Sequence, residues 1–148
     1  MASSDSVTSI GGYAFEDCSS LTNVVIPDSV TFIGERAFDG CGNVETLVIG
    51  DGLTSLDDLP ITSALKSITI GNGVTSIGSS AFSGCKNLTS VTIGNGVTSI
   101  GDSAFFNCSN LTTVNYKGTQ EQWEEQISIS TNNSYLTRAA IIYNYTGE

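Results

Sequence analysis

Four cysteines are the residues of this chain best suited to chemistry, since a thiolate can act as a nucleophile, a metal ligand or half of a disulfide. They are Cys18, Cys41, Cys85 and Cys108. Their separations of 23, 44 and 23 residues differ from the close C-x-x-C pairing of metal sites. The chain also has no histidine that could serve as a base for a nucleophile. We therefore expect no enzyme but a ladder of buried free thiols, although stacked pairs could approach disulfide range.

Carboxylates are the other groups that could bind a ligand. Fifteen acidic residues against five basic ones give a formal charge of −10. Asp57 and Asp58 could contribute to a weak calcium site, but two acids fall short of the roughly six to eight oxygens that calcium takes. The negative charge repels phosphate backbones and anionic membranes, and no apolar run is long enough to span a bilayer. We expect no cofactor, no metal, no nucleic-acid partner and no membrane insertion.

A repeat of 23 residues accounts for the cysteine spacing. Residues 74–96 are followed at once by a near copy at 97–118, and a single unit of this kind cannot bury its own apolar side. The repeat units are residues 7–29, 30–52, a shortened 53–73, 74–96 and 97–118. Residues 1–6 are interpreted as an added remnant or part of a preceding repeat, and residues 119–148 as a C-terminal cap. Because the chain starts in the middle of a repeat, we expect it to be a fragment.

Each unit is expected to supply one strand of a parallel sheet. In the fourth unit Leu88, Val91 and Ile93 alternate with small polar residues, which is typical of a half-buried strand. The equivalent strands are Leu21–Ile26, Val44–Ile49, Leu65–Ile70 and Leu111–Tyr116. The glycine-rich stretches that follow are predicted to supply positive φ angles in a sharp turn. The Val-Thr-x-Ile stretch predicts a second short extended piece, and Ala-Phe-x-x-Cys leaves room for a turn of helix.

One phenylalanine per full-length unit is predicted to stack in the interior, and two segments, the third unit and the C-terminal end, depart from the regular repeat. These residues are Phe15, Phe38, Phe82 and Phe105. The third unit has Asp57–Thr62 in place of that stretch, so a dent is expected there. After Gly118 the sequence predicts a cap, in which Thr119–Gln122 forms the capping box of a helix through Trp123 and Ala140–Tyr145 forms a closing strand.

The motif Val-Thr-x-Ile-Gly-x-x-Ala-Phe-x-x-Cys-x-x-Leu-Thr-x-Val-x-Ile closely resembles the repeats of BspA-like bacterial surface proteins. The tail at Tyr116–Trp123, Leu136–Ala139 and Ile141–Tyr143 also resembles the ending common in that family. The expected fold is a leucine-rich repeat solenoid of about five stacked β-coils, with a parallel sheet on one face, short extended or helical-turn returns on the other, and a helix-plus-strand cap. The resemblance implies a cell-surface or secreted, non-catalytic binding protein, with a protein or glycoprotein as its ligand.

The outer face of the sheet is the first candidate for ligand contact. Its residues are predicted to be small, hydroxyl-rich and uncharged, a composition that also suits an ordinary solvated sheet. Two aromatic residues lie at positions that are polar in other units, and they join the candidates. The candidate contact residues are Tyr13, Asn23, Val25, Phe32, Val48, Ser67, Thr69, Ser90, Thr92, Thr113 and Asn115.

Two other roles stay open from the sequence. The domain could be a structural spacer or scaffold attached to another functional module. It could also self-associate, because the first unit, beginning at Val7, has no evident N-terminal cap and leaves an apolar end open.

Overall fold

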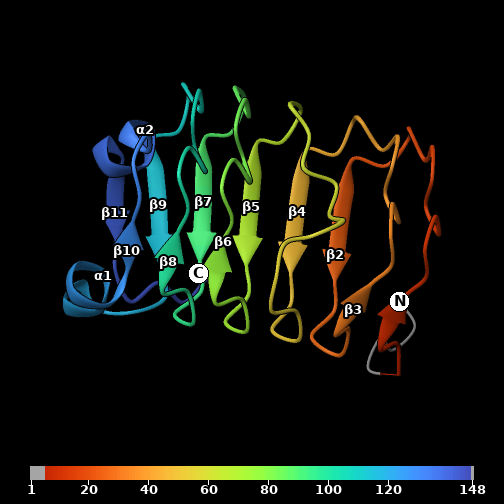
Figure 1. Ribbon diagram of the computed structural model, residues 1–148, viewed down its shortest axis with the longest axis horizontal. Helices are drawn as coiled ribbons and strands as arrows, with labels where there is room; N and C mark the ends of the chain where they lie inside the picture. The colour runs from red at the N-terminus through yellow and green to blue at the C-terminus, as the bar shows by residue number, and fades with distance from the viewer. Residues whose placement is uncertain (1–5, 148) are drawn as a thin grey trace.

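One strand from each coil builds a parallel sheet that runs the length of the molecule (Figure 1). The computed structural model describes residues 6–147. The strands of this large sheet are β2 (Asn23–Ile26), β4 (Thr46–Ile49), β5 (Ser67–Ile70), β7 (Ser90–Ile93), β9 (Thr113–Tyr116) and β11 (Ala140–Ile142), neighbours in that order. Residues one repeat apart are register partners, as Ser67 is with Ser90. The predicted parallel sheet is confirmed.

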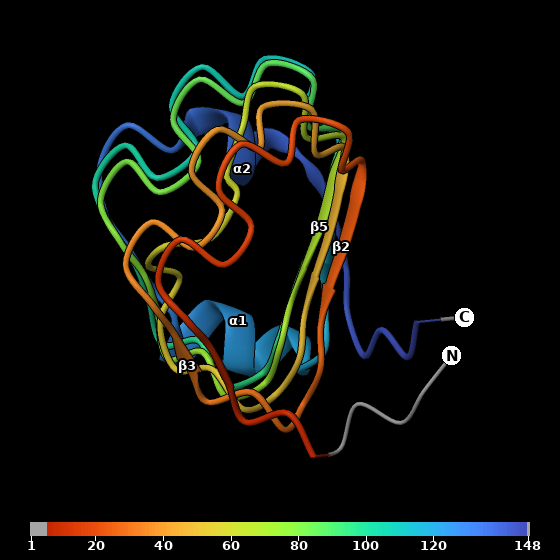
Figure 2. The same ribbon diagram turned by 90° about the vertical axis from the view of Figure 1, so that its right-hand side faces the viewer.

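The core lies between the large sheet and the returning segments of the coils (Figure 2). Alternate strand residues point inward, so that Ile68 and Ile70 are buried while Ser67 and Thr69 between them are half-exposed. Burying such an aliphatic side chain stabilises the fold by about 1.5–3 kcal/mol. Because the atoms that cover it belong to the coils before and after, the stability comes from stacking.

A second, smaller parallel sheet runs along the return side but is interrupted in the middle. Its first part pairs β1 (Ser9–Ile10) with β3 (Phe32–Ile33). Its second part joins β6 (Ser76–Ile77), β8 (Ser99–Ile100) and β10 (Ser128–Ile129). The third coil contributes no strand to either part of this small sheet. The shortened unit thus breaks the small sheet, while the large sheet continues past it.

The returns are chains of tight turns rather than the turn of helix that the sequence predicted. In the first coil Ala14 donates its N–H to the carbonyl of Gly11, and Cys18 donates to Phe15. Each full-length return contains two residues with left-handed backbone. These pairs are Tyr13 and Asp17, Arg36 and Gly40, Ser80 and Gly84, and Ser103 and Asn107. The reversals turn alternate N–H groups toward the next coil, where those of the first and fourth returns find backbone acceptors.

The glycines after the strands have a different role from the predicted one. Gly50, Gly71 and Gly94 are not among the residues with positive φ, so the prediction was wrong on this point. A Cβ placed on Gly71 would instead lie 2.2 Å from the carbonyl oxygen of Gly50. Glycine is needed here because neighbouring coils approach too closely for any side chain.

Side-chain oxygens hold these turns together from coil to coil. The Asp28 carboxylate accepts the backbone N–H of Asp51 at 2.8 Å, and the Asp51 carboxylate accepts that of Asn72 at 2.7 Å. The Asn72 amide oxygen then accepts the N–H of Asn95 at 3.1 Å. We call this series the turn ladder.

The C-terminal cap is also a sixth coil. It begins with α1 (Gln120–Gln126), whose predicted capping box between Thr119 and Gln122 is present, and Trp123 packs edge-on against Tyr116 with ring centroids 5.1 Å apart. β10 and β11 then extend the two sheets, with α2 (Ser134–Arg138) between them. β11 ends before Tyr145, the predicted end, because the Tyr145 N–H turns back to the Tyr116 carbonyl.

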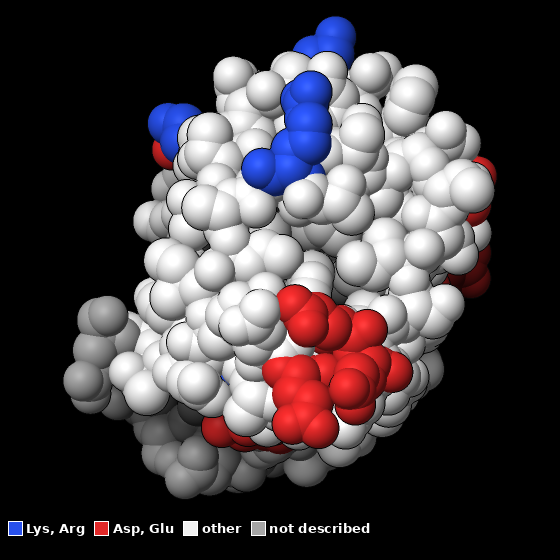
Figure 3. All heavy atoms as spheres, turned by 90° about the vertical axis from the view of Figure 1, so that its left-hand side faces the viewer, with Lys and Arg blue, Asp and Glu red and all other residues white. Residues whose placement is uncertain are grey.

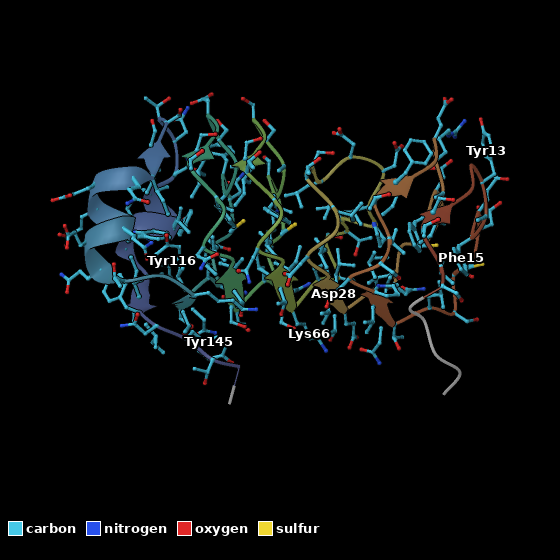
Figure 4. All side chains as sticks on the ribbon, turned by 90° about the horizontal axis from the view of Figure 1, so that it is seen from below. Tyr13, Phe15, Asp28, Lys66, Tyr116 and Tyr145 are labelled. Carbon is cyan, nitrogen blue, oxygen red and sulfur yellow. The ribbon has the colours of Figure 1, made fainter. Side chains whose placement is uncertain are left out.

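The phenylalanine stack is split into two pairs. Phe15 stacks on Phe38 and Phe82 stacks on Phe105, each pair with ring centroids 5.2 Å apart. Phe82 and Phe105 are fully buried, but Phe15 is 40% exposed, contrary to the prediction that all four rings are internal. The reason is its place in the first coil, where no preceding coil among residues 6–147 covers its other face (Figure 4).

Candidate interaction surface

The large sheet collects nine of the eleven predicted contact residues on its outer face. Its register aligns them in two rows across the strands. The rows are Asn23, Thr46, Ser67, Ser90 and Thr113, and Val25, Val48, Thr69, Thr92 and Asn115. Thr46 belongs to the first row although it was not among the predicted contacts. This arrangement gives a flat surface of hydroxyl, amide and β-branched side chains.

Accessibility varies strongly along the second row. Val25 is 64% exposed, whereas Thr92 is only 7% exposed. The amide nitrogen of Asn115 lies 3.5 Å from the Thr92 hydroxyl and donates to it. Thr92 is therefore a buried part of the sheet surface, and its predicted role as a ligand contact is not available to it in this conformation.

A shallow groove lies where the outer face meets the turns. Val25, Val48 and Thr69 line it, and the turn-ladder residues Asp28 and Asp51 lie along its edge. Lys117, Pro27 and Gly50 also contribute to its lining. We call this depression the sheet groove. It combines apolar, hydroxyl, carboxylate and ammonium groups on a rigid backbone, so it can bind both apolar and hydrogen-bonding parts of a ligand.

The sequence reasoning missed the charged members of the sheet groove. The register could have found them, since residues 27, 50, 71, 94 and 117 form a third row after the two predicted ones. Three of these positions are glycine and one is proline, so Lys117 is the only long side chain in the row. Asp28 and Asp51 follow the first two positions and were considered only as turn residues.

The two predicted aromatic contacts lie elsewhere. Tyr13 is 47% exposed in the first return at the N-terminal end (Figure 4), and the Arg36 guanidinium lies 5.8 Å from the centre of its ring. Phe32 is 61% exposed on β3 of the small sheet. The predicted contact set therefore does not form one site, because Tyr13 and Phe32 lie away from the outer face of the large sheet.

The thiols point inward and hold the coils together. Cys41 and Cys108 each donate to a carbonyl of the preceding coil at 3.1 Å, those of Phe15 and Phe82. All four cysteines are free, and all but the half-exposed Cys18 are buried. Burial raises the pKa of the Cys85 thiol to about 11 and that of Cys108 to about 12. At neutral pH these thiols are protonated and poor nucleophiles.

The acidic residues do not assemble a metal site in the region described. No three Asp, Glu or Cys side chains among residues 6–147 are placed to hold one ion. Asp57 and Asp58 are engaged separately, the first by the Ser55 hydroxyl at 3.2 Å and the second by the Arg36 N–H at 3.1 Å. Other acids gather at the C-terminal end, where α1 carries Glu121, Glu124 and Glu125 (Figure 3). Within the same residues, no helix has the length and apolarity needed to cross a membrane.

Comparison with known proteins gives a consistent result. A family model described as a BspA-type leucine-rich repeat region matches residues 1–59 and 61–144 in six copies. A leucine-rich cell surface protein from Faecalibacterium prausnitzii is 36% identical, with a TM-score of 0.65 over 84% of this chain. A leucine-rich repeat protein from T. pallidum is 31% identical, with a TM-score of 0.53 over 74% of this chain.

The match covers only part of those two proteins. The chain spans 33% of the length of the F. prausnitzii protein and 52% of the T. pallidum protein. No curated protein matches the chain significantly.

Proposed function

The chain belongs to the BspA-type leucine-rich repeat family, and from this premise we propose that it is a non-enzymatic, adhesin-like interaction module of a bacterial surface or secreted protein. Its ligand is a protein or glycoprotein that lies along the outer face of the large sheet. The observation that carries the proposal is the sheet groove, where Val25 and Val48 lie beside Asp28, Asp51 and Lys117. Such a mixture suits a polypeptide, which has both apolar and hydrogen-bonding parts.

The rigidity of the surface supports the same role. Each strand of the large sheet pairs in register with its neighbours, so a ligand would meet side chains already held in place and would lose less entropy on binding. The rows contain no aromatic or arginine residue, and these usually dominate tight interfaces. We therefore expect many modest contacts spread over several coils. The cell-surface description of the F. prausnitzii protein is in keeping with an extracellular location.

The test is a binding screen followed by substitution in the sheet groove. The domain would be screened against extracellular-matrix proteins and glycans, with an acidic protein of similar charge as the background control. For any saturable ligand, the double variant Val48→Glu, Thr69→Glu should weaken binding by at least about tenfold, because both changes place charge in the groove. The matched control is Ser79→Glu, Ser83→Glu, which adds the same charge to exposed positions of the fourth return. Equal affinity for the two variants would contradict the assignment.

A spacer role is the second candidate, and the continuous ties between coils favour it. Besides the turn ladder, the threonine hydroxyls of Thr89 and Thr112 donate to carbonyls 23 residues earlier, at 3.1 and 3.3 Å. Because hydrogen bonds join each coil to the next, the stack resists stretching and keeps a fixed length. A spacer would tolerate the charged groove variant without loss of function in the whole protein, but it would lose function when one coil is deleted. An interaction module would instead lose function with the charged groove variant and would tolerate the deletion of one coil.

A further inference from the structure

The returns of neighbouring full-length coils are joined by backbone hydrogen bonds at alternate residues. Three N–H groups of the first return donate to three carbonyls of the second, and the fourth and fifth returns repeat the pattern. The pairs are Tyr13 to Glu35, Phe15 to Ala37 and Asp17 to Asp39, and then Ser80 to Asp102, Phe82 to Ala104 and Gly84 to Phe106. Their N···O distances lie between 2.7 and 3.1 Å. A full-length return therefore offers three donors to the coil that follows it.

The second return does not find this set of acceptors, because the third coil lacks the matching stretch. Arg36, equivalent to Tyr13, donates its N–H to the side chain of Asp58 in place of a backbone carbonyl. Phe38 and Gly40 are the equivalents of Phe15 and Asp17, and their N–H groups have no acceptor among residues 6–147. Phe38 is only 6% exposed, so its N–H is costly to leave without an acceptor, whereas Gly40 is exposed and its N–H can meet water. Both donors remain open to a ligand that supplies oxygen atoms.

Both donors border a cleft between the second and third returns. The second return contributes residues 36 and 38–42, and the third return contributes residues 58–62. Phe38, Leu59 and Ile61 make part of its wall apolar. In the view along the solenoid (Figure 2), the yellow return of the third coil follows a shorter path than the green returns after it. We call this feature the return cleft.

A second depression adjoins the return cleft at Asp58. It lies between β3 and residues 53–58, and the exposed residue Phe32 is part of its lining. Asp57 and Asp58 line this second depression, and Asp39 lines the return cleft. Arg36 is the one basic residue of the two depressions within the described chain, and its guanidinium is already ion-paired with Asp39. The combined surface is therefore acidic.

We propose that the return cleft binds an extended segment of a partner polypeptide that carries a bulky apolar side chain and, a few residues along, a basic one. Carbonyl oxygens of the segment accept the N–H groups of Phe38 and Gly40, as the next coil does elsewhere in the solenoid. The apolar side chain packs against Phe38 and Leu59, and the basic side chain faces Asp57 and Asp58. Neutral carbonyls suit this place better than a carboxylate, which would add negative charge beside three aspartates.

This site is separate from the sheet groove. The two returns that line the cleft lie on the side of the solenoid away from the large sheet (Figure 2). It could serve a second contact with the same partner or a contact with another one. The inference does not rest on the proposed function, and either can fail without the other.

A peptide that copies the missing stretch is the direct probe. Residues 78–86 of the fourth coil, made with Ser in place of Cys85, give the sequence GSSAFSGSK with one lysine and no acid. Titrated into isotope-labelled protein, the peptide with blocked ends should shift the amide signals of Phe38 and Gly40 saturably. A peptide of the same composition in scrambled order should not do so. Unmoved Phe38 and Gly40 signals at millimolar peptide would overturn the proposal.

Two variants test the cleft and its charge. Replacing residues 57–64 by a copy of residues 78–87 fills the third return to full length, and binding of the peptide should be lost. Asp57→Asn with Asp58→Asn keeps oxygen acceptors in place but removes two charges, so affinity should fall about threefold to tenfold. This second variant keeps the test open if the filled chain does not fold.

The remaining comparisons separate the alternatives. The groove variant Val48→Glu, Thr69→Glu should bind the peptide as the parent does; a loss there would mean that the peptide lies on the sheet, which overturns the return-cleft assignment. Binding that requires a free C-terminal carboxylate would also overturn it, because the donors would then be serving an anion. Failure of every matrix ligand in the screen, together with saturable peptide binding, would reject the sheet groove and leave this inference standing.

Discussion

The individual side chains contribute to stability according to their place in the stack. Phe82 and Phe15 occupy the same position of the repeat and each stacks on one neighbouring ring. Phe82 is fully buried in the fourth coil, while Phe15 is 40% exposed in the first. A comparison of the two measures the effect of being covered by coils on both sides, with the residue type held constant.

We expect Phe82→Ala to lower the free energy of unfolding by about 3–5 kcal/mol, because the lost ring leaves a cavity that the neighbouring coils cannot close. Phe15→Ala should cost about 1–2 kcal/mol, since water already reaches its ring. Urea denaturation followed by far-UV circular dichroism, which reports on the strands of all coils, measures both. Equal losses for the two variants would show that position in the stack does not matter.

The buried thiols make stability depend on alkaline pH. At neutral pH the thiols of Cys85 and Cys108 are protonated in the folded and unfolded chain and add no pH dependence. As pH rises above the ordinary thiol pKa of 9.0, the unfolded chain loses protons that the folded chain keeps, because burial raises the folded pKa values to about 11 and 12. Unfolding should become easier by up to about 1.4 kcal/mol per pH unit for each thiol.

Urea denaturation between pH 8 and pH 10 would measure this slope. The double variant Cys85→Ser, Cys108→Ser is the control, because its hydroxyls do not titrate in this range. The same alkaline loss in parent and variant would assign the effect to other groups, such as Tyr116, whose pKa is also raised by burial.

At the scale of single elements, the turn ladder ties each turn to the next. Asp51 stands in the middle of it, accepting from Asn72 while its own N–H donates to Asp28. Asp51→Ala should lower the free energy of unfolding by about 1 kcal/mol, through the loss of one acceptor at the surface. Asp51→Asn keeps the oxygen and removes a charge near Asp28, so it should stay within about 0.5 kcal/mol of the parent. Chemical denaturation distinguishes the two variants. A loss of more than about 0.5 kcal/mol for Asp51→Asn would contradict the role of this oxygen in the turn ladder.

The elements differ in how far the sequence could predict them. The strands of the large sheet were predictable because the positions of Leu88, Val91 and Ile93 are apolar in every unit. The missing stretch at Asp57–Thr62 predicted a dent in the third unit but not the break in the small sheet, because Leu53 and Leu56 keep the apolar pattern of the second extended piece. The left-handed returns were not predictable, because Tyr13 and Arg36 adopt positive φ although neither is a residue type that favours it. Contacts with the next coil impose that conformation.

The candidate site was predictable only in part, for a related reason. Register placed Val25, Val48 and Thr69 correctly on one face, because side chains alternate along a strand. The burial of Thr92 depends on how close Asn115 lies on the next strand, which the repeat pattern does not encode. The donors of Phe38 and Gly40 could not be found at all until the partners of the neighbouring coils were known.

At the scale of the whole molecule, the two ends of the described solenoid are unlike. α1 and Trp123 cover the last layer of the core at the C-terminal end. At the other end Val7 is 44% exposed and Phe15 is 40% exposed, and Ile10 and Leu21 are half-buried beside them. An apolar layer of this kind favours contact with another protein surface.

We expect the chain to self-associate through this first coil. Light scattering should show the average mass rising with protein concentration, and Phe15→Ser should shift the mass toward the monomer because it removes an apolar contact. Phe106→Ser is the matched control, since Phe106 is exposed to a similar extent, 46%, in the fifth coil. A monomer mass for the parent at every concentration would contradict the expectation.

The broken small sheet has a consequence for folding cooperativity. In a linear array, each coil is coupled to its neighbours, and the array melts as one unit only when every coupling is strong. The third coil keeps its coupling through the large sheet but loses it in the small sheet and in the phenylalanine stack. The array therefore has a weak link at one third of its length. The first two coils can open while the later ones stay folded, which would give native-state hydrogen exchange with two distinct free energies along a single domain.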